Sequence, residues 1–110
     1  MPLTRKFKRT IQDRVQRDPA FREALLREGM ECMLDGDVET GKALLRDFIN
    51  ATIGFEGLSK VSRKPSKSLM RMFGRHGNPQ ARNLFEIVGH LQKREGVRLR
   101  IRCSRKSMAA

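Results

Sequence analysis

Apolar residues recur every three or four positions through the first half of the chain, which is the period of helices that bury one face. Residues 5–52 therefore predict three helices. Their apolar positions are Phe7, Ile11 and Val15, then Phe21, Ala24, Leu25, Cys32 and Met33, then Ala43, Leu44, Leu45, Phe48 and Ile49. Asp18 is suited to cap the second helix and Asp37 the third, because a short carboxylate accepts hydrogen bonds from free backbone N–H groups.

The predicted elements become shorter between residues 55 and 73. A helix of two turns comes first, with Leu58 and Val61 on its apolar face. Pro65 interrupts the pattern, because proline disfavours helical geometry at the residue before it and can itself open a helix. In the second helix Leu69, Met72 and Phe73 are the inward positions, and Ser66, Lys67, Met70 and Arg71 form another face. The segment therefore predicts two short helices joined by a tight connection.

A longer amphipathic helix is predicted over residues 78–95, opened by Asn78-Pro79 and ended by Gly96. Its apolar stripe consists of Ala81, Leu84, Val88 and Leu91. After it the period changes to two: Val97, Leu99 and Ile101 alternate with Arg98, Arg100 and Arg102. This alternation is typical of a half-buried strand, here over residues 97–102.

A single strand cannot satisfy its own edges, so the segment 97–102 is expected to pair. Its partner could be its own copy in a homodimer, a second short strand that the pattern does not identify, or a sheet edge of another protein. Residues 103–110 predict a basic tail beyond it.

The charge of the chain changes the picture, because a net +12 on 110 residues attracts polyanions through counterion release. Residues 1–17 carry six basic residues and one acid, residues 18–50 four and eight, and residues 51–110 fourteen and three, giving +5, −4 and +11. An acidic middle before a basic half predicts two partners of opposite surface charge. The absence of Tyr and Trp disfavours RNA recognition by stacking.

The composition offers no chemistry for catalysis, and we expect neither an enzyme nor a cofactor. Cys32 and Cys103 have no metal-ligand spacing with His76 or His90, so no metal site is predicted. The sequence shows no signal peptide and no apolar run long enough to cross a bilayer. We therefore expect a cytoplasmic protein without a membrane partner and without a disulfide.

Two short helices with a basic, hydrogen-bonding face on the second fit the major groove of double-stranded DNA. The sequence predicts base contacts from Ser66, Lys67, Met70 and Arg71, where Met70 could meet a thymine methyl group. Phosphate contacts are predicted from Lys60, Arg63, Lys64, Arg75 and Asn78.

The stretch from Leu58 to Arg71, followed by Gly77-Asn78-Pro79 and an amphipathic helix, resembles the phage-repressor-type (Xre-like) helix-turn-helix family over about residues 44–96. Ser59 stands where that family has an Ala, and Arg63 stands four residues later in place of the turn Gly. The resemblance implies an all-α, lambda-repressor-like bundle of five to six helices over residues 1–96, with the short C-terminal strand added.

The segments 18–21, 41–52 and 64–72 are similar to the HigA-like addiction-module antidotes, and nearly the whole chain fits that group. This resemblance implies a dimeric repressor that binds an operator in its own operon and neutralises a RelE-like toxin, which cleaves messenger RNA. The acidic segment could then face the toxin, with Glu28, Glu31 and Glu39 as contacts. The alternatives are a free-standing phage-like repressor and, from another class, a small basic RNA- or ribosome-associated protein.

Overall fold

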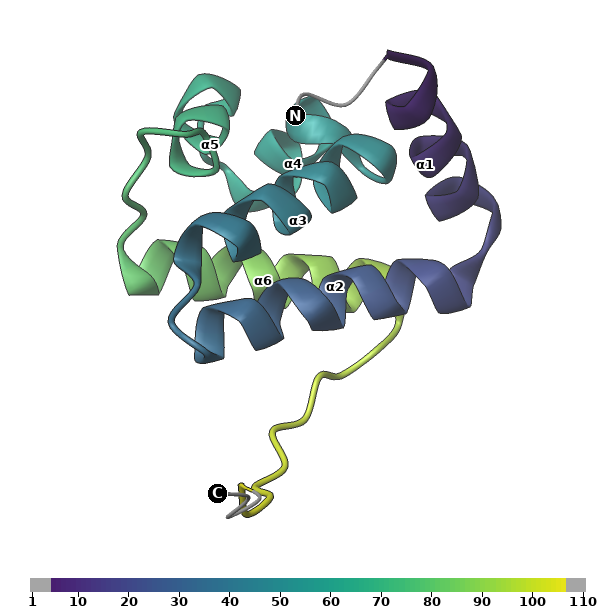
Figure 1. The fold of residues 1–110 in the computed structure, drawn as a ribbon. Helices are drawn as coiled ribbons and strands as arrows, with labels where there is room; N and C mark the ends of the chain where they lie inside the picture. Colours follow the sequence, from purple (N-terminus) through teal and green to yellow (C-terminus); the bar gives the residue numbers. More distant parts are fainter. Residues whose placement is uncertain (1–4, 107–110) are drawn as a thin grey trace.

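A computed structural model describes residues 5–106, apart from the side chains of Lys8 and Ile11, and the described part contains six helices and no strand (Figure 1). The helices are α1 (Arg5–Arg17), α2 (Pro19–Leu34), α3 (Val38–Ala51), α4 (Gly54–Ser62), α5 (Ser66–Met72) and α6 (Ala81–Glu95). The predicted all-α class and the order of the helices are confirmed. The last helix begins at Ala81 instead of Asn78-Pro79, because Gln80 before it is still extended.

Two of the helix starts use the caps that the sequence predicts. The Asp18 carboxylate accepts hydrogen bonds from the backbone N–H groups of Ala20 and Phe21, at 3.1 and 3.2 Å. Asp37 accepts one from Thr40 at 3.3 Å. Each carboxylate satisfies N–H groups that have no partner within the helix, so these two boundaries are set locally.

One apolar core runs through the whole bundle. Every helix contributes at least one buried side chain to it: Val15, Leu26, Leu45, Leu58, Leu69 and Leu91, in the order α1 to α6. α3 adds Phe48 and Ile49, and α6 adds Ile87, which the predicted stripe had missed. The two short helices are therefore part of the same packed body as the long ones.

The prediction of a strand over residues 97–102 is wrong for the single chain. Residues 97–106, here called the arm, leave the end of α6 without secondary structure and extend away from the body (Figure 1). Val97 and Leu99 still pack against the core, but Ile101 is 83% exposed. The alternation had the right face for two positions, whereas strand formation needs a second strand, and none lies within residues 5–106.

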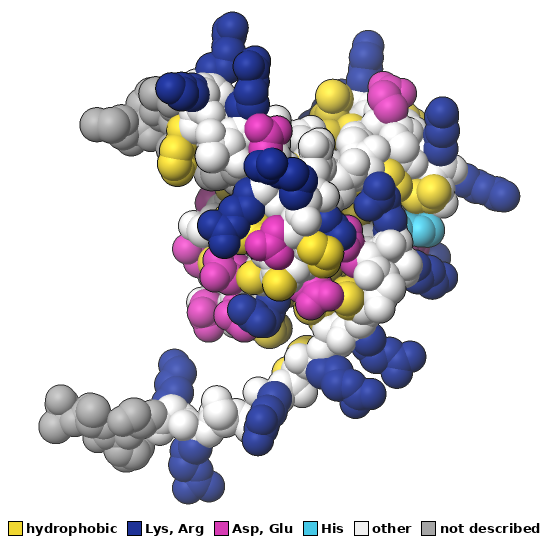
Figure 2. Space-filling model, turned by 90° about the vertical axis from the view of Figure 1, so that its right-hand side faces the viewer, with side chains coloured by type: hydrophobic (Ala, Val, Ile, Leu, Met, Phe, Trp, Pro, Cys, Tyr) yellow, Lys and Arg dark blue, Asp and Glu magenta, His cyan; other side chains and the backbone are white. Residues whose placement is uncertain are grey.

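Basic side chains project from the arm along its length (Figure 2). Two backbone groups near its start hold it to Gln92 of α6: the Val97 N–H donates to the Gln92 carbonyl at 3.1 Å, and the Leu99 N–H donates to the Gln92 side-chain oxygen at 2.7 Å. Residues 107–110 of the predicted basic tail lie outside the described residues.

Candidate nucleic-acid interface

The two short helices predicted from residues 55–73 are present, and three residues connect them. Arg63 ends α4 in the left-handed conformation, with φ 60° and ψ 29°, and its N–H donates to the Ser59 carbonyl at 2.9 Å. This is the position at which the helix-turn-helix family that the sequence resembles has a turn Gly. The chain therefore makes the tight turn with a residue that pays a steric penalty for that conformation.

Serine hydroxyl groups hold this turn together. The Ser59 Oγ donates to the Lys64 carbonyl at 2.5 Å, and the Ser62 Oγ accepts a hydrogen bond from the Lys64 N–H at 3.3 Å. An alanine in place of Ser59 could not make the first bond. The hydroxyl thus supplies a local contact that offsets part of the strain at Arg63.

A buried lysine fixes the far end of α5. Lys42 of α3 is 2% exposed, and its ammonium donates to the carbonyls of Gly74 at 3.1 Å and Gly77 at 2.6 Å. Glu39 lies 3.1 Å from the same nitrogen. Because these three oxygens surround the charge, they replace much of the water that the ammonium loses on burial.

Two further contacts bring the loop after α5 close to its last turn. Arg46 donates to the Phe73 carbonyl at 3.2 Å. Gly77 lies so near the helix end that a Cβ built on it would be 1.9 Å from the Arg71 carbonyl oxygen. Only glycine fits this approach, so the loop 74–77 is held tightly against α5.

The role of Lys42 was not predicted from the sequence. The signal was available, because Lys42, Leu45 and Ile49 follow the spacing i, i+3, i+7 of one helix face and the last two are buried. A lysine at an inward position needs an acceptor, but the acceptors come from a loop more than thirty residues later.

The predicted base-contacting residues share one face of α5. Lys67 and Arg71 are exposed, Met70 is 52% exposed, and Ser66 is partly buried. Leu69 is fully buried on the opposite side, as its spacing predicts. The structure therefore presents a short face with two cations and one flexible apolar side chain to solvent.

Of the predicted phosphate contacts, Lys60, Arg63, Arg75 and Asn78 are exposed around α5. They lie in α4, in the turn and in the loop that follows α5. A set of donors on both flanks of a helix is the arrangement that positions it on a phosphate backbone.

Lys64 has a second role that the sequence did not reveal. Its ammonium lies 3.2 Å from Glu86 Oε2 and 3.2 Å from Asn83 Oδ1, both on α6. The hydrogen bond and charge of Lys64, helped by Arg82, hold the pKa of the Glu86 carboxyl below its ordinary value. Lys64 therefore ties the turn to α6, and it has less freedom for a phosphate than the other four residues.

A hollow of about 330 Å³, lined mainly by residues with polar groups, opens beside α5. Its lining includes Ser68, Arg71, His76, Asn78 and Asn83. Ser68 and His76 were not among the predicted contacts, although Ser68 is an exposed residue of α5 and His76 is an exposed residue of the loop after it. The hollow extends the hydrogen-bonding surface from the face of α5 to the start of α6.

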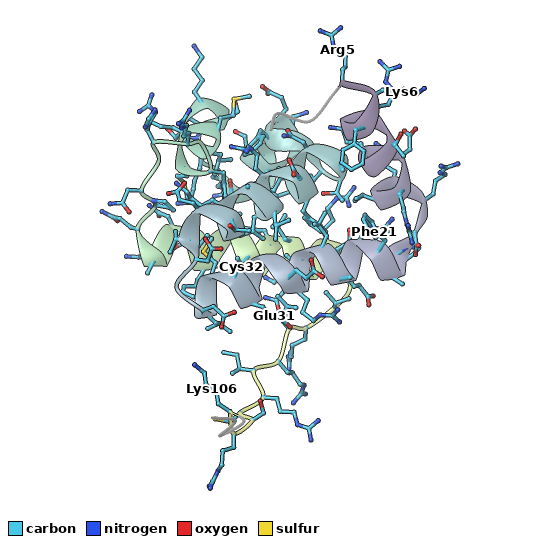
Figure 3. All side chains as sticks on the ribbon, in the orientation of Figure 1. Arg5, Lys6, Phe21, Glu31, Cys32 and Lys106 are labelled. Carbon is cyan, nitrogen blue, oxygen red and sulfur yellow. The ribbon has the colours of Figure 1, made fainter. Side chains whose placement is uncertain are left out.

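The carboxylates predicted to contact a basic toxin are all exposed. Glu28 and Glu31 lie on α2, and Glu39 lies in the first turn of α3. Glu31 projects from the side of α2 that faces the arm (Figure 3). Glu31 pairs with Arg27 at 3.7 Å, and Glu39 pairs with the buried Lys42, so Glu28 is the least constrained of the three carboxylates.

The acidic character of this region also affects Cys32 on α2. Burial raises the pKa of its thiol, and the nearby carboxylates, Asp37 first, raise it further. A thiol with a raised pKa is a poor nucleophile. The described residues also contain no group of three or more metal-ligating side chains.

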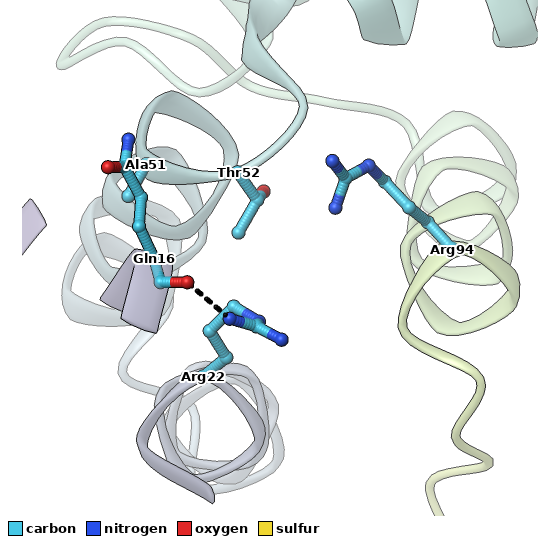
Figure 4. Close-up of a pocket in the computed structure, with 5 residues that line it drawn as sticks. All are labelled: Gln16, Arg22, Ala51, Thr52 and Arg94. Atoms are coloured by element: carbon cyan, nitrogen blue, oxygen red, sulfur yellow. Dashed lines mark hydrogen bonds between the residues drawn. The ribbon is translucent and has the colours of Figure 1, made fainter. Parts of the chain in front are cut away.

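A second polar hollow, of about 340 Å³, lies where α1, α2, α3 and α6 meet (Figure 4). Arg22 on its wall donates to the carbonyls of Val15 and Gln16 at 3.0 and 2.9 Å and to Glu95 at 3.0 Å. These partners give Arg22 a structural role, because it joins the end of α1 to the end of α6.

In comparisons with known proteins, no family model, curated protein or solved structure matches this chain. The resemblance to HigA-like antidotes therefore stays a prediction. Among the described residues, no helix has the length and apolar character needed to span a membrane.

Replacing Lys42 by Met should lower the free energy of unfolding by about 2–4 kcal/mol, because the carbonyls of Gly74 and Gly77 would lose their donor inside the body. Urea unfolding followed by circular dichroism measures the change. Lys93→Met, at an exposed position of α6, is the matched control and should change stability by less than about 0.5 kcal/mol. Equal losses in both variants would contradict the role of Lys42.

Replacing Arg63 by Gly should raise the free energy of unfolding by about 0.5–1 kcal/mol, since glycine adopts a φ of 60° without the steric penalty. Lys60→Gly, one turn earlier inside α4, should instead destabilise the protein by about 1 kcal/mol. The same urea titration compares the two variants. A destabilised Arg63→Gly protein would mean that the arginine side chain makes contacts that outweigh its backbone strain.

Proposed function

We propose that this protein is a sequence-specific DNA-binding transcriptional regulator with α5 as its recognition helix, and that it serves as the antitoxin of a toxin–antitoxin operon. The observation that carries the DNA-binding part is the exposed face of α5, with Lys67, Met70 and Arg71 turned to solvent. Phosphate-binding candidates flank that face on both sides.

The rigidity of α5 supports this function as much as its charge does. The turn at Arg63 fixes one end of the helix, and Lys42 and Arg46 fix the other end. A helix that is already held in place loses little conformational entropy when it binds, so its side chains can discriminate between bases. Arg71 could bind a guanine edge with two hydrogen bonds, and Met70 could contact a thymine methyl group.

The antitoxin part rests on the resemblance to HigA-like antidotes and on the charge of residues 18–50. The carboxylates of this segment would repel phosphates, and Glu28, Glu31 and Glu39 are all exposed. A basic RNA-cleaving toxin would meet complementary charge there. The same chain could then repress its operon through α5 and bind the toxin through residues 1–50.

Lys67→Ala and Arg71→Ala should each weaken binding to the specific duplex by about 1–3 kcal/mol while leaving binding to a scrambled duplex less affected. Lys60→Ala and Arg75→Ala should weaken binding to both duplexes alike, because phosphates carry no sequence information. Fluorescence anisotropy on the two duplexes measures this difference. Equal losses on both duplexes for all four variants would remove base reading from α5.

The reading frame next to the gene should encode a basic toxin of about one hundred residues, and co-expression of this protein should rescue growth that the toxin arrests. Reversing Glu28 and Glu31 to Lys should weaken the complex, because like charges would then meet, whereas Glu39 stays unchanged because it pairs with the buried Lys42. The reversed protein should keep its helical circular dichroism and lose rescue. Rescue that survives this reversal, or a neighbouring frame without toxicity, would leave a free-standing DNA-binding regulator as the function.

A further inference from the structure

An apolar groove of about 310 Å³ lies between α2 and α6, next to the base of the arm. Its apolar lining consists of Met30, Leu34, Phe85, Val88, Leu99 and Ile101. Leu34 is 64% exposed and Phe85 is 58% exposed, so the walls of the groove remain in contact with water in the single chain. Exposed apolar side chains that gather around one groove favour a contact with another macromolecule.

The groove has an unusual rim, because Ile101 both lines it and remains 83% exposed. In a contact between two identical chains around a twofold axis, the same surface occurs on both sides, and residues near the axis meet their own copies. An exposed isoleucine at the edge of an unfilled apolar groove has this self-complementary character. The residue that could fill the groove of one chain is already present at the groove of the other.

The charges around the groove also favour a second copy of the chain as its occupant. The described arm carries five basic residues and no acid: Arg98, Arg100, Arg102, Arg105 and Lys106. Glu31 lines the groove together with Arg27, its ion-pair partner at 3.7 Å, and with Arg100 of the arm. Glu28, one turn earlier on α2, and Asp35, the C-cap of that helix, extend an acidic surface beside the groove. None of the ion pairs found within residues 5–106 joins the arm to the body of its own chain.

The arm also has the right shape to reach a second molecule. It extends away from the body (Figure 1), and its basic side chains stand apart from the acidic ones on the body (Figure 2). A DNA backbone would be repelled by the carboxylates of α2, whereas the basic arm of another copy would be attracted to them.

We propose that this groove is the dimer interface: Ile101 of a second copy of the chain enters the groove between α2 and α6, and the basic arm of that copy lies along the acidic face of α2. The exchange is reciprocal, so each dimer contains two filled grooves around one twofold axis. The inference rests on the proposed repressor in one respect, since a twofold operator needs two recognition helices.

Sedimentation equilibrium of the full chain without DNA tests the interface directly. The wild-type protein should be a dimer, and Ile101→Asp and Leu34→Asp should each raise the dimer Kd at least about a hundredfold, because two apolar contacts per dimer are lost. Both side chains are exposed in the single chain, so the variants should keep their helical circular dichroism and thermal stability. High salt should weaken the wild-type dimer, as the charges across the interface are screened.

Val38→Asp is the matched control, because Val38 is an exposed apolar residue outside the groove lining and receives the same new charge. It should sediment as the wild-type dimer does. A monomeric wild-type protein, or Ile101→Asp and Leu34→Asp proteins that dimerise as tightly as Val38→Asp, would overturn the inference.

Binding of the same variants to a duplex with one half-site separates this inference from the proposed function. Ile101→Asp should keep the half-site affinity, because α5 is untouched. If the chains bind the half-site but the groove variants do not change dimerisation, the proposed interface is wrong and the proposed regulator stands. If the groove variants disrupt the dimer but no chain binds any duplex, the interface stands and the proposed regulator is wrong.

Discussion

The buried ammonium of Lys42 is the contact on which the orientation of α5 depends. It lies in α3, the helix that supplies Leu45, Phe48 and Ile49 to the core, and it binds carbonyls of the loop that follows α5. A buried cation without acceptors would cost several kcal/mol, so the loop is bound to the position where its carbonyls meet the charge. The Gly77 approach and the Arg46 contact then complete the same junction.

The opposite end of α5 depends on strain that packing offsets. Arg63 adopts a left-handed conformation that ordinary side chains disfavour. The turn persists because Leu58 and Leu69 on its two sides are fully buried, and because the rings of Phe55 and Phe73 lie 6.3 Å apart across the same pair of helices. The exposed face between the two fixed ends is therefore presented in one orientation.

Charge is sorted by position in the fold. Basic side chains surround α5 and line the arm, whereas most carboxylates of residues 18–50 lie on α2, beside its two ends or at the start of α3. Lys64 and Glu86 are an exception, since their ion pair joins the turn to α6 and keeps the carboxyl ionised. This sorting assigns a different partner to each face: phosphates for the basic face of α5, and a basic protein surface, that of the toxin or the arm of a second copy, for the acidic face of α2.

The sequence by itself determined the features that depend on neighbouring residues. Its periodicity predicted each helix, Asp18 and Asp37 marked two helix starts, and Pro65 marked the connection before α5. The inward position of Leu69 followed from the same spacing. Helical repeats, caps and proline effects act within one or two turns, so a single sequence contains the information that they need.

Only the tertiary structure decided which partners the charged and apolar side chains find. Lys42 and Gly77 are 35 positions apart, and Lys64 and Asn83 are 19 apart. The alternation of residues 97–102 identified the inward positions Val97 and Leu99, but the strand that it predicted is absent. A strand forms only with a second chain segment beside it. Spacing along the chain determines which face of an element is apolar, and packing between distant elements determines what that face meets.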